Sequence, residues 1–294
     1  MTGGVCVKST PTNNTEAAAL YIVGGTANST DCDGLQRYTF ATKKWDTIKP
    51  SDAVTQNRLW HGAAYLNASD SILVYAGTQD GSQEPSSQTF TIQASEPYRV
   101  LAYQSIAPLA ISPLLMPWSD SEALYIGGSS TNTKAMLFSS PNGWVDSTAS
   151  LAEPLYKTSA IKAVVVDGDD DSKMLYTFDM SVSPNAVNRT VLVDGTGSPV
   201  SNAKAIYMTR DLKDRSWKRD EVGVNRTAAN WPVYNNTLAP SSTRTQYSIA
   251  KDDNGLVVIS GGNEDDVLCM FTARDNCWVN ATAKLVSKST TQQG

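Results

Sequence analysis

The sequence holds few residues whose types and spacing could carry out catalysis. His61 is the only histidine of the chain, and it lies in the apolar segment RLWHGAAYL. A Ser-His-Asp triad would have to use this residue, and no Gly-x-Ser-x-Gly sequence marks a nucleophile to accompany it. We therefore interpret His61 as a core or strand-edge residue. We name no catalytic residue, and we expect a protein that is not an enzyme.

Metal binding has one weak candidate, the acidic segment DGDDDSK at residues 167–173. Its aspartates alternate, but Ser172 and Phe178 stand where an EF-hand-like loop needs glycine and glutamate. With a single histidine and no Cys-x-x-Cys pair, the chain also lacks the usual ligand pattern of zinc. We expect a tight turn between two strands here, and neither a metal ion nor a cofactor.

The chain has four cysteines, an even number that is typical of a disulfide-bonded protein. Cys269 and Cys277 flank the turn TARDN, and a strand register centred on Ala273 would set them opposite each other. Directly opposed residues lie within the roughly 7 Å between Cα atoms that a disulfide allows. Cys6 and Cys32 are then left for each other, so we predict these two bridges.

The elements that position these residues recur along the chain. An apolar run that stops at a glycine pair, ALYIVGG at 19–25, is echoed by ILVYAG at 72–77, ALYIGG at 123–128, MLYTFDM at 174–180 and LVVISGG at 256–262. Aligned on the last glycine, or on Asp179 where it is replaced, the runs are 52, 51, 51 and 83 residues apart. A phosphate-binding glycine loop would need a helix after Gly25, and the polar segment there has no helical period. The runs are therefore buried strands of a repeat.

Each repeat predicts four short strands, which we call A to D. A strand and a tight polar turn precede each apolar run, and a loop, another strand and a turn follow it. Strand D usually ends the repeat with a tryptophan, and we expect burial at equivalent places for Trp45, Trp144, Trp217 and Trp278. A four-stranded sheet cannot bury its faces alone, whereas stacked sheets can.

The order Arg-x-x-His, Gly-Gly, aromatic residue and Trp resembles the kelch repeat, from about residue 3 to 285. The chain is most similar to extracellular kelch-repeat proteins of filamentous fungi, whose propeller is of the galactose-oxidase type. The resemblance implies an all-β, kelch-type β-propeller of four-stranded antiparallel blades, with one blade for each of the five repeats. The alternative is a six- or seven-bladed ring, complete or as a fragment. We expect a single domain over 1–285 and a flexible tail over 286–294.

The same resemblance bears on copper chemistry. The copper radical oxidases that share this propeller need two histidines and two tyrosines around the metal. The single His61 cannot supply that set, so we do not expect a copper radical oxidase.

The charge and hydropathy of the sequence argue against nucleic-acid binding and against a membrane-spanning segment. The formal net charge is −5, from 24 basic and 29 acidic residues, and the basic residues are scattered among acidic ones. Nucleic-acid binding needs a basic field, which is absent from the sequence, so we expect no nucleic-acid partner. No run of about 18 apolar residues predicts a membrane span.

The cellular location of the protein is indicated by N-glycosylation sequons. Seven occur, a modest excess over chance, at Asn13, Asn28, Asn67, Asn188, Asn225, Asn235 and Asn280. All except Asn280 fall in predicted turns or loops, where a glycan can be attached. The start MTGGVCVKST does not resemble a signal peptide, so we read the chain as a mature secreted or cell-surface domain with an added Met1. The alternative is a cytosolic kelch protein.

Function is then predicted by analogy of fold. We expect a monomeric, secreted or cell-wall propeller that binds a protein or carbohydrate ligand through loops on one face. The alternatives are a carbohydrate-active enzyme with a carboxylate pair at a central channel and an intracellular kelch adaptor. We select Trp231 and Tyr234 in the link VGVNRTAANWPVYNNTLAPSS as exposed, ligand-binding aromatics. The alternative is that Trp231 and Pro232 only pin this link to the propeller.

Overall fold

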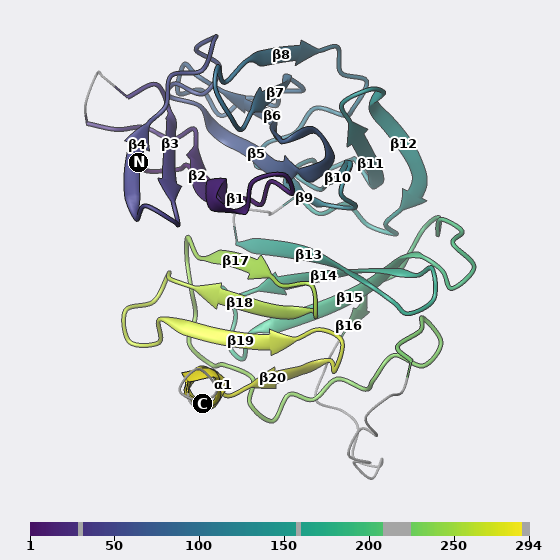
Figure 1. Cartoon of the computed structure of the whole chain (residues 1–294). Coiled ribbons are helices and arrows are strands. Elements are labelled where there is room, and N and C mark those ends of the chain that lie inside the picture. The colour runs from purple at the N-terminus through teal and green to yellow at the C-terminus, as the bar shows by residue number, and fades with distance from the viewer. Residues whose placement is uncertain (29–31, 157–159, 208–224, 290–294) are drawn as a thin grey trace. The chain divides into compact units, whose positions relative to one another are not determined.

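The computed structural model describes residues 1–28, 32–156, 160–207 and 225–289 of the chain. Within these residues, the strands form five sheets of four antiparallel strands, and the strand order in each sheet follows the chain (Figure 1). We call the sheets blades 1 to 5 in chain order. Packing divides the chain into two compact units, Met1–Thr148 with Glu153–Thr158, and Ala149–Ala152 with Ser159–Gly294.

The first unit contains blades 1 to 3, apart from the end of β12. Blade 1 consists of β1 (Val5–Ser9), β2 (Ala19–Val23), β3 (Leu35–Thr39) and β4 (Lys44–Thr47), with a short 3-10 helix η1 (Thr15–Ala17) between β1 and β2. Blade 2 consists of β5 (Leu59–Leu66), β6 (Ser71–Thr78), β7 (Thr89–Gln93) and β8 (Val100–Tyr103), with η2 (Asn67–Ser69) between β5 and β6. Blade 3 consists of β9 (Leu114–Pro117), β10 (Glu122–Ile126), β11 (Lys134–Ser139) and β12 (Gly143–Ser150).

The second unit contains blades 4 and 5. Blade 4 consists of β13 (Ile161–Asp167), β14 (Lys173–Asp179), β15 (Ala186–Val193) and β16 (Ile206–Tyr207). Blade 5 consists of β17 (Ser248–Lys251), β18 (Leu256–Ser260), β19 (Leu268–Thr272) and β20 (Cys277–Val279), and the helix α1 (Ala281–Ser289) follows it. Helix α1 overlaps the segment 286–294, for which the sequence predicted a flexible tail. No helix among the described residues has the length and apolar character to cross a membrane.

The fold class predicted from the sequence is confirmed: the chain is all-β and has five four-stranded antiparallel blades, the building unit of a propeller. Each apolar run found in the sequence is the second strand of its blade, namely β2, β6, β10, β14 and β18. The acidic segment 167–173 is the turn between β13 and β14, as expected. The kelch resemblance, the fungal source and the single domain over 1–285 stay predictions.

Burial of the strands depends on how many faces of a blade are covered. In β6 the side chains alternate between two cores: Ile72 and Val74 pack with blade 1, whereas Leu73 and Tyr75 pack with blade 3. Because both faces are covered, the run is apolar without alternation. In β2, by contrast, Ala19, Tyr21 and Val23 are buried, and the residues between them are only half-buried. Within the first unit, blade 1 therefore has one face buried against blade 2 and one partly open face.

The glycine pair is explained by a close approach of two blades. Gly24 has a φ of +69°, and a Cβ there would overlap His61 Cε1 and lie 2.7 Å from the Arg58 carbonyl oxygen. His61 itself is 5% exposed. Its Nε2 atom lies 2.9 Å from the Val23 carbonyl oxygen, to which it donates. The structure thus agrees with a core role for His61.

We expect Gly24→Ala to lower the free energy of unfolding by about 2 kcal/mol, since it combines backbone strain with a steric clash. Gly81→Ala is the matched control: Gly81 has a φ of +81°, but no atom lies within 4 Å of the place that a Cβ would take there. Only the backbone term of about 1 kcal/mol then applies. Urea titrations of both variants measure the difference, and equal losses would contradict the role of the close approach.

The tryptophan prediction holds at two of the four positions. Trp144 and Trp278 are buried in the cores of their units, and Trp144 Nε1 donates to Thr89 Oγ1 at 2.9 Å. Trp45 was predicted to be buried, and this is wrong, because its side chain is 52% exposed. It lies on the partly open face of blade 1. Trp217 lies outside the described residues.

The predicted opposition of Cys269 and Cys277 is wrong. In the β19–β20 pair, Cys277 lies opposite Thr272, three positions along from Cys269. Because alternate residues of a strand point to opposite faces, the two thiols lie on different sides of the sheet. Cys269 packs into the core of the second unit, and Cys277 Sγ lies 3.1 Å from Thr272 Oγ1. The hairpin is therefore centred between Arg274 and Asp275, and not on Ala273 as the sequence suggested.

All four cysteines are free thiols in the structure. Cys6 is exposed on β1, and Cys32 Sγ lies 3.3 Å from Met1 Sδ. Among the sequons, Asn188 is also misplaced by the sequence, since it lies within β15, where it pairs with Thr177 and Tyr207 instead of lying in a loop. Asn13, Asn28, Asn225 and Asn280 are exposed.

Candidate ligand-binding site

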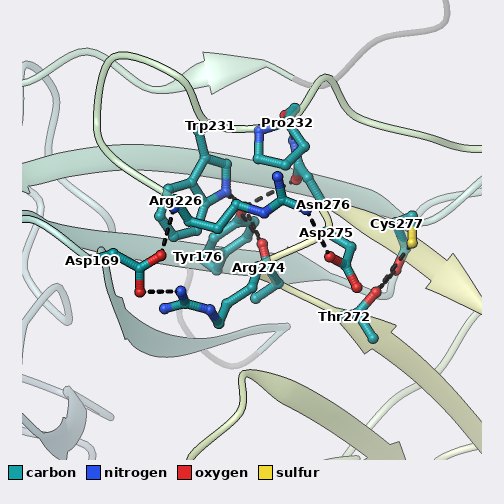
Figure 2. Close-up of polar contacts among 11 residues, drawn as sticks. Asp169, Tyr176, Arg226, Trp231, Pro232, Thr272, Arg274, Asp275, Asn276 and Cys277 are labelled. Atoms are coloured by element: carbon teal, nitrogen blue, oxygen red, sulfur yellow. Dashed lines mark hydrogen bonds and ion pairs between the residues drawn. The ribbon is translucent and has the colours of Figure 1, made fainter. Parts of the chain in front are cut away.

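The two aromatics chosen from the sequence lie in the second unit, and the structure buries the first of them. Trp231 is 8% exposed. Its Nε1 atom donates to Tyr176 Oη at 2.7 Å and to the Ala273 carbonyl oxygen at 3.2 Å (Figure 2). The prediction of an exposed, stacking Trp231 is therefore wrong. A ring held in this way cannot stack on a ligand.

Tyr234 and Pro232 make the same kind of contact. Tyr234 is half-buried, and its Oη atom accepts a hydrogen bond of 2.8 Å from Trp278 Nε1. Asn276 Nδ2 donates to the Pro232 carbonyl oxygen at 2.8 Å. These contacts support the alternative, in which the link is pinned to the blades. We call the described part of this link, residues 225–242, the pinned segment.

Charged residues complete this attachment. Asp169, in the β13–β14 turn, accepts a hydrogen bond of 2.6 Å from the Arg226 backbone N–H and a short one from Arg274 Nη2 (Figure 2). These two hydrogen bonds hold the pKa of Asp169 below its usual value. Arg226 Nη2 lies 3.2 Å from Asp275 Oδ1. Each of these two carboxylates pairs with an arginine, so the charged residues join the pinned segment to the β13–β14 and β19–β20 turns.

A second aspartate of the acidic turn 167–173 also binds the pinned segment. Asp170 accepts a hydrogen bond of 3.1 Å from the Ala228 backbone N–H and a short one from the Ser172 hydroxyl. No group of three or more His, Cys, Asp or Glu side chains suited to a metal ion occurs among the described residues. The acidic residues of the turn 167–173 thus serve to anchor the pinned segment.

Three aromatic side chains among the described residues are more than 40% exposed, and two of them lie on the open face of blade 1. The third, Tyr156, is 55% exposed and lies outside the strands of the first unit. Trp45 is 52% exposed and Phe40 is 42% exposed, with the half-buried Tyr38 between them. The ring centroids of Tyr38 and Trp45 are 5.2 Å apart, and those of Tyr38 and Phe40 are 5.8 Å apart. We call Tyr38, Phe40 and Trp45 the aromatic platform.

Strand register explains why these residues share a face. Lys8 pairs with Leu20, Leu20 with Tyr38 and Tyr38 with Trp45, so the four side chains form one row across the blade. Residue Phe40 follows Tyr38 by two positions and emerges on the same side at the end of β3. The opposite face, with Val7, Tyr21 and Leu35, is buried against blade 2.

A hollow of about 560 Å³ lies beside the platform. The described residues that line it are Lys8, Thr10, Pro11, Thr12, Thr15, Ala18 and Phe40. They come from β1, from the turn with η1 and from the end of β3, so one blade supplies the whole wall. The volume is within the range of small-ligand sites, roughly 300–1,000 Å³.

This arrangement is suited to binding a flat, partly apolar ligand that carries hydroxyl groups. The faces of aromatic rings carry partial negative charge, and they attract the apolar, slightly positive C–H faces of sugar rings. Threonine hydroxyls can both donate and accept hydrogen bonds, as the hydroxyl groups of a sugar do.

Sequence reasoning missed this platform because it assigned every repeat tryptophan to a wedge between blades. The sequence of β2, ALYIV, is apolar throughout like the other runs, and the alternation of buried and half-buried positions that marks a sheet with one open face is seen only in the structure.

No protein-family model matches the sequence. The search of curated proteins gave no match either. Among solved structures, the chain is similar to an auxiliary nutrient binding protein from Bacteroides thetaiotaomicron VPI-5482, with a TM-score of 0.49 and 9% sequence identity. The similarity covers 93% of this chain and 56% of that chain. This chain thus spans little more than half the length of that protein.

Proposed function

We propose that the protein is a non-catalytic carbohydrate-binding protein, secreted or held at the cell surface, and that its ligand binds on the aromatic platform of blade 1. The observation that carries the proposal is the exposure of Phe40 and Trp45 beside a hollow with three threonines. Large aromatic side chains that cluster on a surface mark interaction sites more often than isolated ones do. The site replaces the one at Trp231 and Tyr234 that the sequence favoured.

The proposed location rests on the sequons. Asn13, Asn28, Asn225 and Asn280 have exposed side chains, as attachment of a glycan requires. Asn13 is also close in sequence to Thr12 and Thr15, which line the hollow. A glycan on Asn13 would lie near the rim of the proposed site, so binding assays should include protein made without glycans.

The proposal is tested by removing the platform. We expect the Phe40→Ala, Trp45→Ala double variant to bind a saccharide identified on a glycan array at least about tenfold more weakly, a loss of roughly 1.4 kcal/mol. Stability should change little, because both side chains are largely exposed. Isothermal titration calorimetry gives the affinity, and a thermal melt gives the stability.

Leu101→Ala is the matched control, because Leu101 is an equally exposed apolar side chain on β8 of the same unit, at 51%. It should leave the affinity unchanged. An unchanged affinity in the double variant, or an array on which the protein binds no saccharide, would contradict the proposed function.

A further inference from the structure

One charged side chain, that of Lys8, lines the hollow beside the platform. Of the described residues that line it, Lys8 is the only charged one, and the others are threonine, proline, alanine and phenylalanine. Lys8 is exposed, and no ion pair joins it to an acidic residue in the described part of the chain. Its ammonium group is therefore available to a ligand in the hollow.

A second lysine lies at the same end of blade 1 as the hollow. Lys43 is exposed in the turn between β3 and β4, at the same end of the blade as Phe40. The nearest acidic residue in sequence, Glu16, is exposed in η1 but does not line the hollow. The chain as a whole carries a net charge of −5, so a preference for anionic ligands would not come from its overall charge.

The row across blade 1 sets the distance between this charge and the rings. Neighbouring strands lie about 4.8 Å apart, so the Cα atoms of Lys8 and Tyr38, two strands apart, are separated by roughly 10 Å. Trp45 is one strand further, at roughly 14 Å. A sugar stacked on the platform would thus present its neighbouring sugar unit to the Lys8 ammonium group.

We propose that the site selects an acidic saccharide, in which a neutral or acidic ring stacks on Tyr38, Phe40 and Trp45 while the carboxylate of an adjacent uronate ring pairs with Lys8. This inference rests on the proposed function and deepens it by naming the ligand class. An ammonium–carboxylate pair at an exposed site adds a modest amount of affinity. Its main effect is to discriminate between acidic and neutral ligands of the same length.

The test compares an oligogalacturonate with a neutral cello-oligosaccharide of equal length by isothermal titration calorimetry, using the whole chain. We expect the wild-type protein to bind the oligogalacturonate about fivefold more tightly at low salt, which corresponds to about 1 kcal/mol. Lys8→Gln should remove this preference, so that the two ligands bind with similar affinity. In about 1 M salt the preference should also disappear, because the Debye length falls to about 3 Å.

Lys44→Gln is the matched control. Lys44 is an exposed lysine of the same blade, but it precedes Trp45 by one residue and so points to the opposite face. It should keep the preference for the acidic ligand. If Lys44→Gln and Lys8→Gln reduce the preference equally, the attraction is a general one and the Lys8 site is overturned.

Other outcomes separate the two proposals. If the wild-type protein binds both saccharides equally through the platform, the acidic selectivity is overturned and the proposed function stands. If it binds neither, the acidic selectivity is overturned, and the glycan array decides whether the proposed function stands. If ultracentrifugation shows a dimer that Trp45→Ala dissociates, a second copy of the chain covers the platform, and both proposals are overturned.

Discussion

Replacing Trp231 by alanine is expected to lower the free energy of unfolding of the second unit by about 3–5 kcal/mol, as is usual for a large buried aromatic side chain. The change removes the hydrogen bonds from Nε1 to Tyr176 and Ala273, and it leaves a cavity in the core. It also removes the ring face over which the Arg189 guanidinium lies, with its carbon 5.6 Å from the ring centroid. A urea titration followed by circular dichroism measures this loss.

Val233→Ala is the control for this variant, because Val233 belongs to the same pinned segment and is 47% exposed. It should cost less than about 0.5 kcal/mol. A Trp231→Ala variant that keeps wild-type stability would show that the pinned segment does not hold blades 4 and 5 together. Saccharide binding at blade 1 should be the same in both variants wherever the protein is folded.

Acid is expected to destabilise the protein through His61 before its carboxylates are protonated. Burial, assisted by the charge of Arg58, lowers the pKa of His61 from 6.5 to about 4. The unfolded chain therefore binds a proton that the folded chain excludes at pH values between these two. Stability from neutral His61 is complete above about pH 6.5 and is lost as the pH falls toward 4, by about 3 kcal/mol in all.

The carboxylates with lowered pKa values, such as Asp146 and Asp169, act in a lower window. Their stabilisation is present above the unfolded value of 3.8 and is lost as the pH falls further. The decline between pH 6.5 and 4.5 therefore reports on His61. His61→Gln should be less stable at neutral pH but should show a nearly flat profile across this window. A wild-type profile that is already flat there would contradict the shifted pKa of His61.

The repeating strands could be predicted from the sequence because their signals are local. A run such as SILVYAGT needs only its own residues to show that both faces are covered. A glycine pair at the end of a run, as in ALYIVGG, shows where another backbone approaches. The turn 167–173 was predictable for the same reason, since acidic and small residues favour turns whatever surrounds them.

The errors concern packing between segments that are far apart in the sequence. The register of β19 and β20 depends on the conformation of a four-residue turn, in which Asn276 has a φ of +53°. The burial of Trp231 depends on Tyr176, which lies 55 residues away. Likewise, the tryptophan at this position packs on the preceding blade of its own unit in blades 3 and 5, whereas blade 1 has no preceding blade within the first unit and Trp45 is exposed.

The candidate binding site was therefore the least predictable part of the molecule. Tyr38 and Trp45 look like core residues of a strand pair in the sequence, and their spacing is the same as that of Phe271 and Trp278, which are buried. Their role becomes visible only once one face of blade 1 is seen to be open.

The confinement of the platform and its hollow to residues 8–45 has a consequence for how such a protein changes over generations. Every wall residue belongs to one repeat, and none of those side chains is needed to cover blade 2. Mutations of these wall residues can change ligand preference at little cost in stability, whereas mutations on the opposite, buried face destabilise the fold and are removed by selection. Duplication or exchange of this first repeat would carry the binding site with it as one inherited piece.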